Sequence, residues 1–182
     1  VYWMLTFGVR HVHPIALRPD MARYTIYVDG ISKAFAATGL RVGWGIGPTT
    51  IIGQMSDLLT HVGAWAPRPE QVATTPLLGH DATIDEFHGR MPGEVYKRLS
   101  PLHDGIVSLK GAGHPVDAAI PSGAIYLSAR FGLHGKSVVE NGKPRRLEND
   151  DDVRAYLLKR AGLAAVPFSA FGQPDGTGWF RL

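Results

Sequence analysis

Residues 24–47 read YTIYVDGISKAFAATGLRVGWGIG, two strand-like runs separated by small residues. The first run, Tyr24 to Val28, is rich in β-branched and aromatic residues and predicts a buried strand. The second run, Arg41 to Ile46, alternates apolar residues with Gly43 and Gly45 and predicts another strand. A glycine-lined strand face lets a second backbone or a ligand approach closely. We therefore expect functional residues beside this pair of strands.

Lys33 is the only charged residue between Asp29 and Arg41. A lysine directly after a buried strand, among small and apolar neighbours, loses hydration, and desolvation favours the neutral amine. A neutral lysine amine attacks carbonyl compounds and forms a Schiff base. The alternative is a loop lysine whose ammonium group extends into water.

Ser32 and Arg41 carry the groups that bind a phosphate. A guanidinium offers a bidentate fork to phosphate oxygens, and a serine hydroxyl adds one more donor. A cofactor with both an aldehyde and a phosphate needs an amine that bonds to its aldehyde, and donors such as these that bind its phosphate. Pyridoxal 5′-phosphate is that cofactor, and we predict it here.

The spacing of these residues resembles the signature of the class I and II aminotransferases, and within them the aspartate aminotransferase-like enzymes. They belong to the fold-type I pyridoxal-phosphate enzymes. Their signature is Ser-Lys, small residues, then Gly-x-Arg-x-Gly and an aromatic residue; here residues 32–44 read SKAFAATGLRVGW. At average residue usage, six such matches have a chance probability on the order of 10⁻⁷ per start site.

Three further segments resemble elements of the same family. The family has an Asp-Glu-(Val/Ile)-Tyr element upstream of its lysine, and here Tyr2 follows Val1, 31 residues before Lys33. Residues 121–126, PSGAIY, resemble its Pro-x-Gly-x-(Phe/Tyr)-Tyr turn, and residues 179–182, WFRL, resemble its aromatic-Arg-Leu-Ser end. The resemblance therefore covers essentially the whole chain, as the C-terminal half of a typical member.

The resemblance implies a transfer of an amino group between an α-amino acid and a 2-oxo acid. Lys33 would form the Schiff base with the cofactor and then carry a proton between substrate and cofactor. Arg41 and Ser32 would bind the cofactor phosphate, and Tyr2 would donate a hydrogen bond to the 3′ oxygen. Arg181 would hold the substrate α-carboxylate as a bidentate pair and so orient the Cα–H bond.

The resemblance also implies the architecture, an α/β chain from a fold-type I transferase. Residues 1–90 would be the C-terminal part of the large cofactor-binding domain, and residues 91–182 the small α+β C-terminal domain. Both ends lie in apolar runs, Val1–Leu5 and Trp179–Leu182, so we expect the sequence to be part of a longer protein. The family's ring-nitrogen aspartate and glycine-rich phosphate cup would precede Val1.

Two alternative functions stay open. One is a truncated chain that binds the cofactor, or a partner chain, without turnover. The other is a different fold-type I pyridoxal-phosphate enzyme, such as a decarboxylase, lyase or synthase. Retention of Arg181 fits a substrate that keeps its α-carboxylate and so favours amino transfer.

Composition excludes several other classes. The 182 residues include 19 basic and 16 acidic ones, a net charge of +3, which is too small to indicate nucleic acid binding. The sequence has no cysteine, which excludes disulfides, thiolate metal sites and cysteine nucleophiles. No apolar run is long enough to span a membrane.

His11 and His13 have no third ligand nearby, so we predict no metal site. With no membrane span and no visible signal peptide, we expect a cytoplasmic compartment. The resemblance implies a homodimer.

Periodicity and turn residues predict the remaining elements. Residues 135–149 are polar and predict a surface loop. Apolar residues at helical spacing, or acidic residues at a helix start, predict helices over 51–62, 69–78, 92–109 and 150–161. Runs of apolar residues predict strands over 124–131, 164–168 and 179–182.

Overall fold

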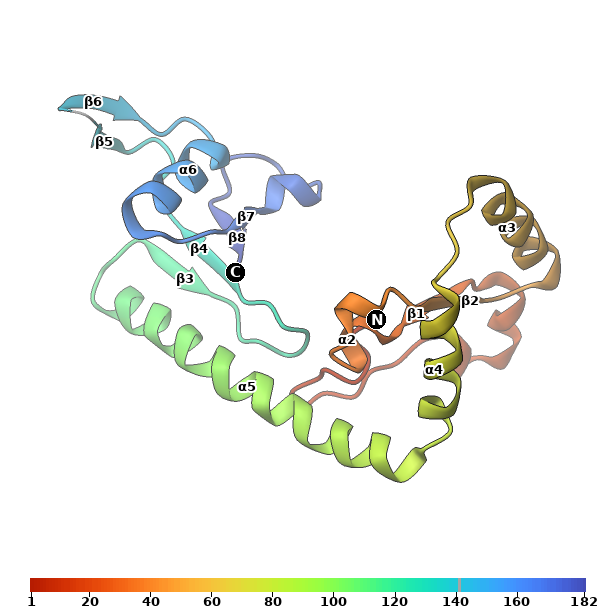
Figure 1. Cartoon of the computed structure of the whole chain (residues 1–182). Helices are drawn as coiled ribbons and strands as arrows, with labels where there is room; N and C mark the ends of the chain where they lie inside the picture. The colour runs from red at the N-terminus through yellow and green to blue at the C-terminus, as the bar shows by residue number, and fades with distance from the viewer. Residues whose placement is uncertain (141) are drawn as a thin grey trace. The chain divides into compact units, whose positions relative to one another are not determined.

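A computed structural model of the chain describes residues 1–140 and 142–182, and the side chains of all of these except Asp81. It divides the chain into two units, Val1–Glu94 and Val95–Leu182, and the division falls within helix α5 (Asp81–Gly111). Helices and strands occur in both units, which agrees with the predicted α/β class (Figure 1). In the described part of the chain, no helix has the length and apolar character needed to cross a membrane.

The first unit is built on a sheet of two antiparallel strands, β1 and β2. In chain order its elements are α1 (Pro14–Leu17), η1 (Pro19–Tyr24), β1 (Tyr27–Gly30), α2 (Ile31–Ala34), η2 (Thr38–Leu40), β2 (Gly43–Ile46), α3 (Thr49–Val62), α4 (Arg68–Leu78) and the start of α5. The predicted helices over 51–62 and 69–78 are confirmed as α3 and α4. Helix α3 ends at Gly63, whose φ of +68° favours glycine.

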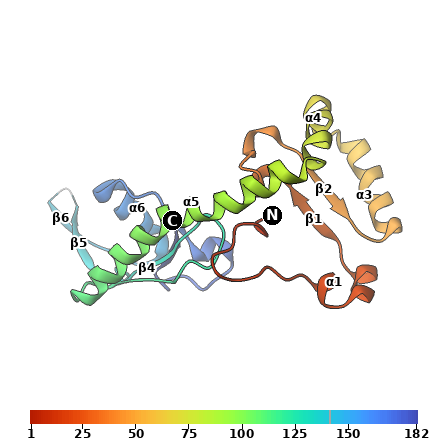
Figure 2. The same cartoon turned by 90° about the horizontal axis from the view of Figure 1, so that it is seen from below.

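The long helix was predicted too short at its N-terminal end. We expected it to begin at Pro92, because proline is favoured in the first turn of a helix. The structure instead begins α5 at Asp81 and carries the helix through Pro92 (Figure 2). A proline inside a helix lacks one hydrogen-bond donor, and this cost was not large enough to end the helix here.

The predicted close approach at the glycine face of β2 is confirmed at Gly43. Gly43 pairs with Gly30 of β1, and a Cβ atom added at Gly43 would lie 2.9 Å from the carbonyl oxygen of Asp29. A Cβ added at Gly30 would lie 2.8 Å from the carbonyl oxygen of Val42. The two backbones are therefore closer here than any residue with a side chain would permit.

Gly43→Ala is expected to destabilise the first unit by about 1–3 kcal/mol, the usual cost of overpacking. The matched control is Gly45→Ala, because a Cβ at Gly45 would meet only the side chains of Met55 and Ile52, at 3.6 Å and 3.8 Å. Urea unfolding of the two variants measures the difference. Equal unfolding midpoints would show that the strand pair can separate without cost.

The second unit contains a four-stranded antiparallel sheet in the order β3-β4-β8-β7. Its elements after α5 are β3 (Val116–Ala118), β4 (Ser128–Phe131), β5 (Ser137–Glu140), β6 (Lys143–Arg146), α6 (Asp150–Ala161), β7 (Val166–Pro167), η3 (Phe168–Phe171) and β8 (Trp179–Arg181). Helix α6 matches the predicted helix over 150–161, and the side chain of Asn149 caps it by accepting a hydrogen bond from the Asp152 amide.

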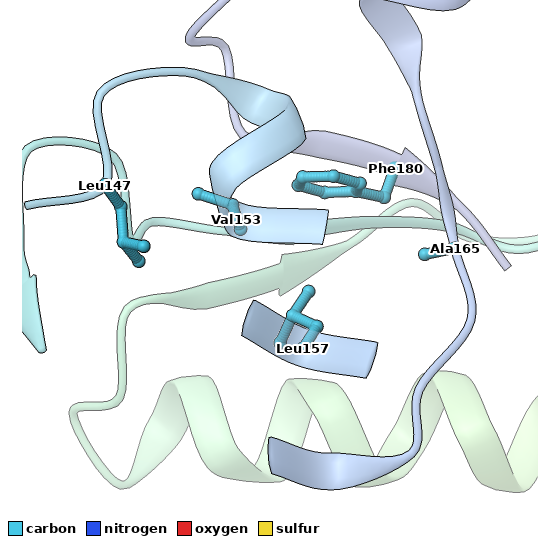
Figure 3. Packing of buried hydrophobic residues seen from close by; sticks show 5 residues of the cluster. All are labelled: Leu147, Val153, Leu157, Ala165 and Phe180. Atoms are coloured by element: carbon cyan, nitrogen blue, oxygen red, sulfur yellow. The ribbon is translucent and has the colours of Figure 1, made fainter. Parts of the chain in front are cut away.

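Helix α6 packs its apolar face against this sheet. Figure 3 shows the side chains that meet there: Leu147, Val153, Leu157, Ala165 and Phe180. Phe180 and Val153 are completely buried. Because neighbouring strand residues face opposite sides of a sheet, the burial of Phe180 directs Trp179 and Arg181 to the other face.

Two expectations for this unit were wrong. The segment 135–149 is not a loop throughout, since β5 and β6 form an antiparallel hairpin in it; residue 141 lies outside the described residues. Its charged composition concealed the strands, whose backbones pair in register and which share a cross-strand ion pair between Glu140 and Arg145. The strand expected over 124–131 begins only at Ser128, because Ala124 adopts a φ of +63° and residues 124 and 125 form a bend.

Glu140 of β5 makes two ion pairs that depress its pKa to about 2. The largest cause is a hydrogen bond from the Lys159 ammonium at 2.5 Å, followed by one from Arg145 at 2.9 Å. A carboxylate with a lowered folded-state pKa stabilises the fold above its unfolded value and loses that contribution as the pH falls.

The contribution of Glu140 is therefore expected to be complete above about pH 4.5 and to disappear as the pH falls to about 2. Urea unfolding between those pH values measures the free energy of unfolding. In Glu140→Gln this free energy should fall less with decreasing pH than in wild type. Glu148→Gln is the control, because Glu148 is exposed and pairs only with Arg146, at 3.4 Å. Identical pH profiles for wild type and Glu140→Gln would contradict the ion-pair account.

Candidate active site

The pairing of β1 with β2 brings Ser32 and Arg41 to the same pocket. The pocket has a volume of about 200 Å³ and is lined by Val1, Asp29, Gly30, Ser32, Arg41, Val42 and Gly43. The amide of Ile31 donates to the carbonyl of Val42 at 3.2 Å, which extends the pairing by one residue past each strand end. Two residues nine positions apart in the sequence are thereby placed around one cavity.

Arg41 is exposed and keeps most of its donors available. Its backbone is left-handed, with a φ of +57°, at the end of η2. One guanidinium nitrogen donates to the carbonyl of Thr38 at 2.9 Å, which holds the side chain near the turn. A guanidinium has five N–H donors, so the rest of the fork can bind an anion.

Asp29 is a pocket residue that the sequence analysis did not single out. It is only 7% exposed; its carboxylate accepts a hydrogen bond from the Gly30 amide at 2.8 Å and another from the Tyr27 hydroxyl at 3.2 Å. Burial, followed by the adjacent Asp29 charge, raises the pKa of Tyr27, so Tyr27 keeps its proton and remains a donor. The signal available in sequence was an acidic residue directly after the strand-like run Tyr24 to Val28. The expectation that this run is a buried strand was wrong: Tyr24 ends η1, the strand spans Tyr27–Gly30, and Val28 is 63% exposed because one face of the two-stranded sheet is uncovered.

Lys33 lies on the single turn α2 and is half-buried. It does not line the pocket that holds Ser32 and Arg41. Across residues 1–140 and 142–182, the structure records no hydrogen bond or ion pair of its ammonium group, so the amine is available to react.

Tyr2 is also half-buried and lies outside that pocket. Its carbonyl accepts a hydrogen bond from the Leu5 amide at 2.9 Å, which turns the chain immediately after it. The structure therefore unites Ser32 with Arg41 but does not place Tyr2 or Lys33 in their cavity.

Arg181, in the second unit, lies close to two aromatic rings. Its guanidinium carbon lies 4.5 Å from the ring centre of Tyr126 and 4.8 Å from that of Phe171. Both distances are within the range of cation–π attraction. Rings on the faces of a guanidinium leave its edge, which carries the N–H donors, free to bind a carboxylate in the plane.

The loop that leads into β8 is fastened to the start of α6. Asp150, completely buried, accepts a hydrogen bond from the Gly178 amide at 3.1 Å. Asp175 accepts one from the Asp150 amide at 2.9 Å and one from the Gly176 amide at 2.8 Å. These bonds fix the chain three residues before Arg181. From sequence, Asp150 was assigned only to the start of a helix.

His11 and His13 lie near the start of α1. Within the described residues, no group of three or more His, Cys, Asp or Glu side chains could hold a metal ion. His13 has a structural role, since its Nδ1 accepts a hydrogen bond from the Ala16 amide at 3.3 Å and caps α1.

Comparison with known proteins connects both units to one family. Residues 2–182 match the family model described as aminotransferase class I and II. The chain is 33% identical over 166 residues to the aspartate aminotransferase of Rhizobium meliloti strain 1021, covering 91% of this chain and 38% of that protein. It is 31% identical over 177 residues to the kynurenine–oxoglutarate transaminase of Dictyostelium discoideum, covering 94% and 39% respectively.

A solved structure shows the same relation. The crystal structure of the aspartate aminotransferase from Rhizobium meliloti aligns with all of this chain and 43% of its own, with a TM-score of 0.80 and 29% identity. The chain thus spans about two fifths of the length of the relatives it matches.

Proposed function

This chain belongs to the class I and II aminotransferase family, and we propose that it contributes the lysine of a pyridoxal-phosphate-dependent aminotransferase. The reaction is the transfer of an amino group between an α-amino acid and a 2-oxo acid. The observation that carries the proposal is the placement of Ser32 and Arg41 around one pocket, with the unpaired amine of Lys33 next in the chain to Ser32. The matched relatives differ in their named substrates, so the proposal is limited to these two substrate classes.

The residues present fit the phosphate end of the cofactor. The Ser32 hydroxyl and the Arg41 guanidinium are a neutral and a cationic donor, the set that phosphate prefers. Gly30 and Gly43, both in the lining, have no Cβ, which lets the two strand backbones beside the pocket approach each other closely. When bound, the cofactor supplies an electron-withdrawing ring that stabilises negative charge at the substrate Cα. Tyr2 would donate a hydrogen bond to the 3′ oxygen of that ring.

Lys33 has two tasks in this proposal. Its amine would condense with the aldehyde of a bound cofactor, with loss of one water molecule, and would so keep the cofactor in place between turnovers. When not bonded to the cofactor, the same amine would act as the base that takes the proton from the substrate Cα and returns it at C4′ of a bound cofactor. Such proton transfer contributes about 10²–10⁴-fold to a rate when the base is well positioned.

Arg181 binds the substrate α-carboxylate. The rings of Tyr126 and Phe171 lie close to its guanidinium, and the planar fork of donors favours a bidentate pair with a carboxylate. A substrate held by that pair presents its Cα–H bond in one orientation.

The domain and assembly predictions complete the proposal. Residues 1–90 would form part of the large cofactor-binding domain and residues 91–182 the small C-terminal domain. We also propose a cytoplasmic homodimer. Exposed apolar side chains on the first unit, among them Val28 at 63% and Ile46 at 61%, support association with further protein surface.

A half-reaction tests the proposed activity. The purified chain is loaded with pyridoxal 5′-phosphate, and single amino acids are added while the visible absorbance is recorded. Loss of the band with release of one 2-oxo acid per chain is expected for amino transfer. Release of CO₂ would indicate a decarboxylase, and a stable band with every amino acid would indicate cofactor binding without turnover.

A further inference from the structure

His88 connects helix α5 to the turn that carries Lys33. It is 6% exposed, and its Nε2 lies 2.8 Å from the carbonyl oxygen of Ala34, 54 residues earlier in the chain. A carbonyl oxygen can only accept a hydrogen bond, so Nε2 carries the hydrogen and donates it.

The Lys33 turn depends on this donor. Helix α2 is one turn long, and its carbonyl groups have no following helical turn to bond them. The amides of Phe35 and Ala36 donate to the carbonyls of Ile31 and Lys33, both at 3.2 Å. The carbonyl of Ala34, a completely buried residue, receives its hydrogen bond from His88. A buried carbonyl left without a partner would favour a different backbone at this turn.

The ring of His88 also contacts the segment that carries Tyr2. Its centre lies 4.9 Å from the Phe35 ring on the Lys33 side and 6.0 Å from the Trp3 ring, immediately after Tyr2. Both contacts have an edge-to-face geometry, which aromatic pairs favour. One buried side chain therefore touches both segments whose residues are assigned to the cofactor.

We propose that His88 is a positioning residue whose Nε2 donor holds the Lys33 turn. The proposal rests on the proposed function for the role of Lys33. The hydrogen bond and ring contacts themselves do not depend on that function.

Three variants separate the donor from the ring. His88→Phe keeps an aromatic ring and loses the donor. His88→Gln replaces the ring with an amide whose nitrogen reaches the position of Nε2. His88→Asn carries the same amide one methylene shorter, so it cannot reach the Ala34 carbonyl. It is matched to His88→Gln and serves in place of His88→Phe if circular dichroism shows that the latter does not fold.

Two measurements on the full chain do not require the cofactor. The rate of acylation of Lys33 by a small reagent is compared with that of exposed Lys136 by mass spectrometry, and hydrogen exchange is followed in the peptide that contains residues 31–37. In His88→Phe and His88→Asn, we expect the Lys33 rate to change by about threefold or more and exchange to become at least about tenfold faster, as loss of a buried hydrogen bond predicts. His88→Gln should return both values to within about twofold of wild type.

A third measurement separates this inference from the proposed function. Borohydride trapping of pyridoxal 5′-phosphate in the wild-type chain reports whether Lys33 binds the cofactor. If trapping fails while acylation and exchange respond as expected, the proposed function is wrong and the positioning role stands. If trapping succeeds but the folded His88→Phe or His88→Asn variants match wild type in both measurements, the positioning role is overturned. Equal behaviour of His88→Gln and His88→Asn would also overturn it.

Discussion

Lys33→Ala is expected to eliminate the absorbance band that pyridoxal 5′-phosphate gains when it bonds to the chain, leaving the spectrum of the free cofactor, and to lower amino transfer on the order of 10⁴-fold or more. Lys33 is one of six lysines in the sequence. It combines partial burial, small and apolar neighbours, and an ammonium group for which the described residues provide no ion pair. Its loss removes both the covalent attachment of the cofactor and the base that moves the substrate proton.

Absorbance spectra, followed by borohydride reduction and peptide mapping, measure this effect. In wild type the label should lie on the peptide that contains residue 33, and in Lys33→Ala it should be absent. Lys136→Ala is the matched control, because Lys136 is an exposed lysine of the second unit. A band that persists in Lys33→Ala would assign the reactive amine to another residue and end the proposed role.

Arg181→Leu should weaken binding of amino acid and 2-oxo acid by about 10-fold to 150-fold. Hydrogen bonds to charged groups contribute about 1.5–3 kcal/mol, and each 1.4 kcal/mol is a factor of about ten. Arg181→Lys keeps the charge but loses the planar fork and its contacts with Tyr126 and Phe171, so it should recover only part of the affinity.

Titration of the cofactor absorbance with a 2-oxo acid gives the dissociation constant in each variant. Arg130→Leu is the control, because Arg130 lies in the adjacent strand β4 and donates to the Thr177 carbonyl at 3.3 Å. Tyr126→Phe provides a second control, since it keeps the ring that stacks on Arg181. Equal affinities in Arg181→Leu and Arg130→Leu would exclude Arg181 from carboxylate binding.

Local sequence patterns predicted the elements whose residues carry strong and consistent signals. Helices α3, α4 and α6 lie where apolar spacing and cap residues placed them. The hairpin of β5 and β6 was missed, because charged residues indicate a loop unless the cross-strand ion pairs of Glu140 and Arg145 are known. The first part of α5 was missed because a proline is favoured in the first turn of a helix but disfavoured in its interior, and Pro92 lies in the interior.

The residues expected to carry the chemistry were named from the chain alone. Ser32, Lys33 and Arg41 stand in one short segment, where reactive type, spacing and small neighbours coincide. The glycines at 30 and 43 could likewise be recognised, since a residue without a side chain signals close backbone approach.

Contacts between distant segments could not be predicted in this way. The hydrogen bond from His88 to the Ala34 carbonyl joins residues 54 positions apart. The two rings beside Arg181 belong to Tyr126, which precedes β4, and to Phe171 in the short 3₁₀ helix η3. The type of a residue determines which hydrogen bonds it can form. Its spacing in the sequence determines which neighbours it contacts along one helix or strand. Which carbonyl a buried histidine satisfies, or which rings lie beside an arginine, depends on how separate elements pack, and that becomes definite only in the folded chain.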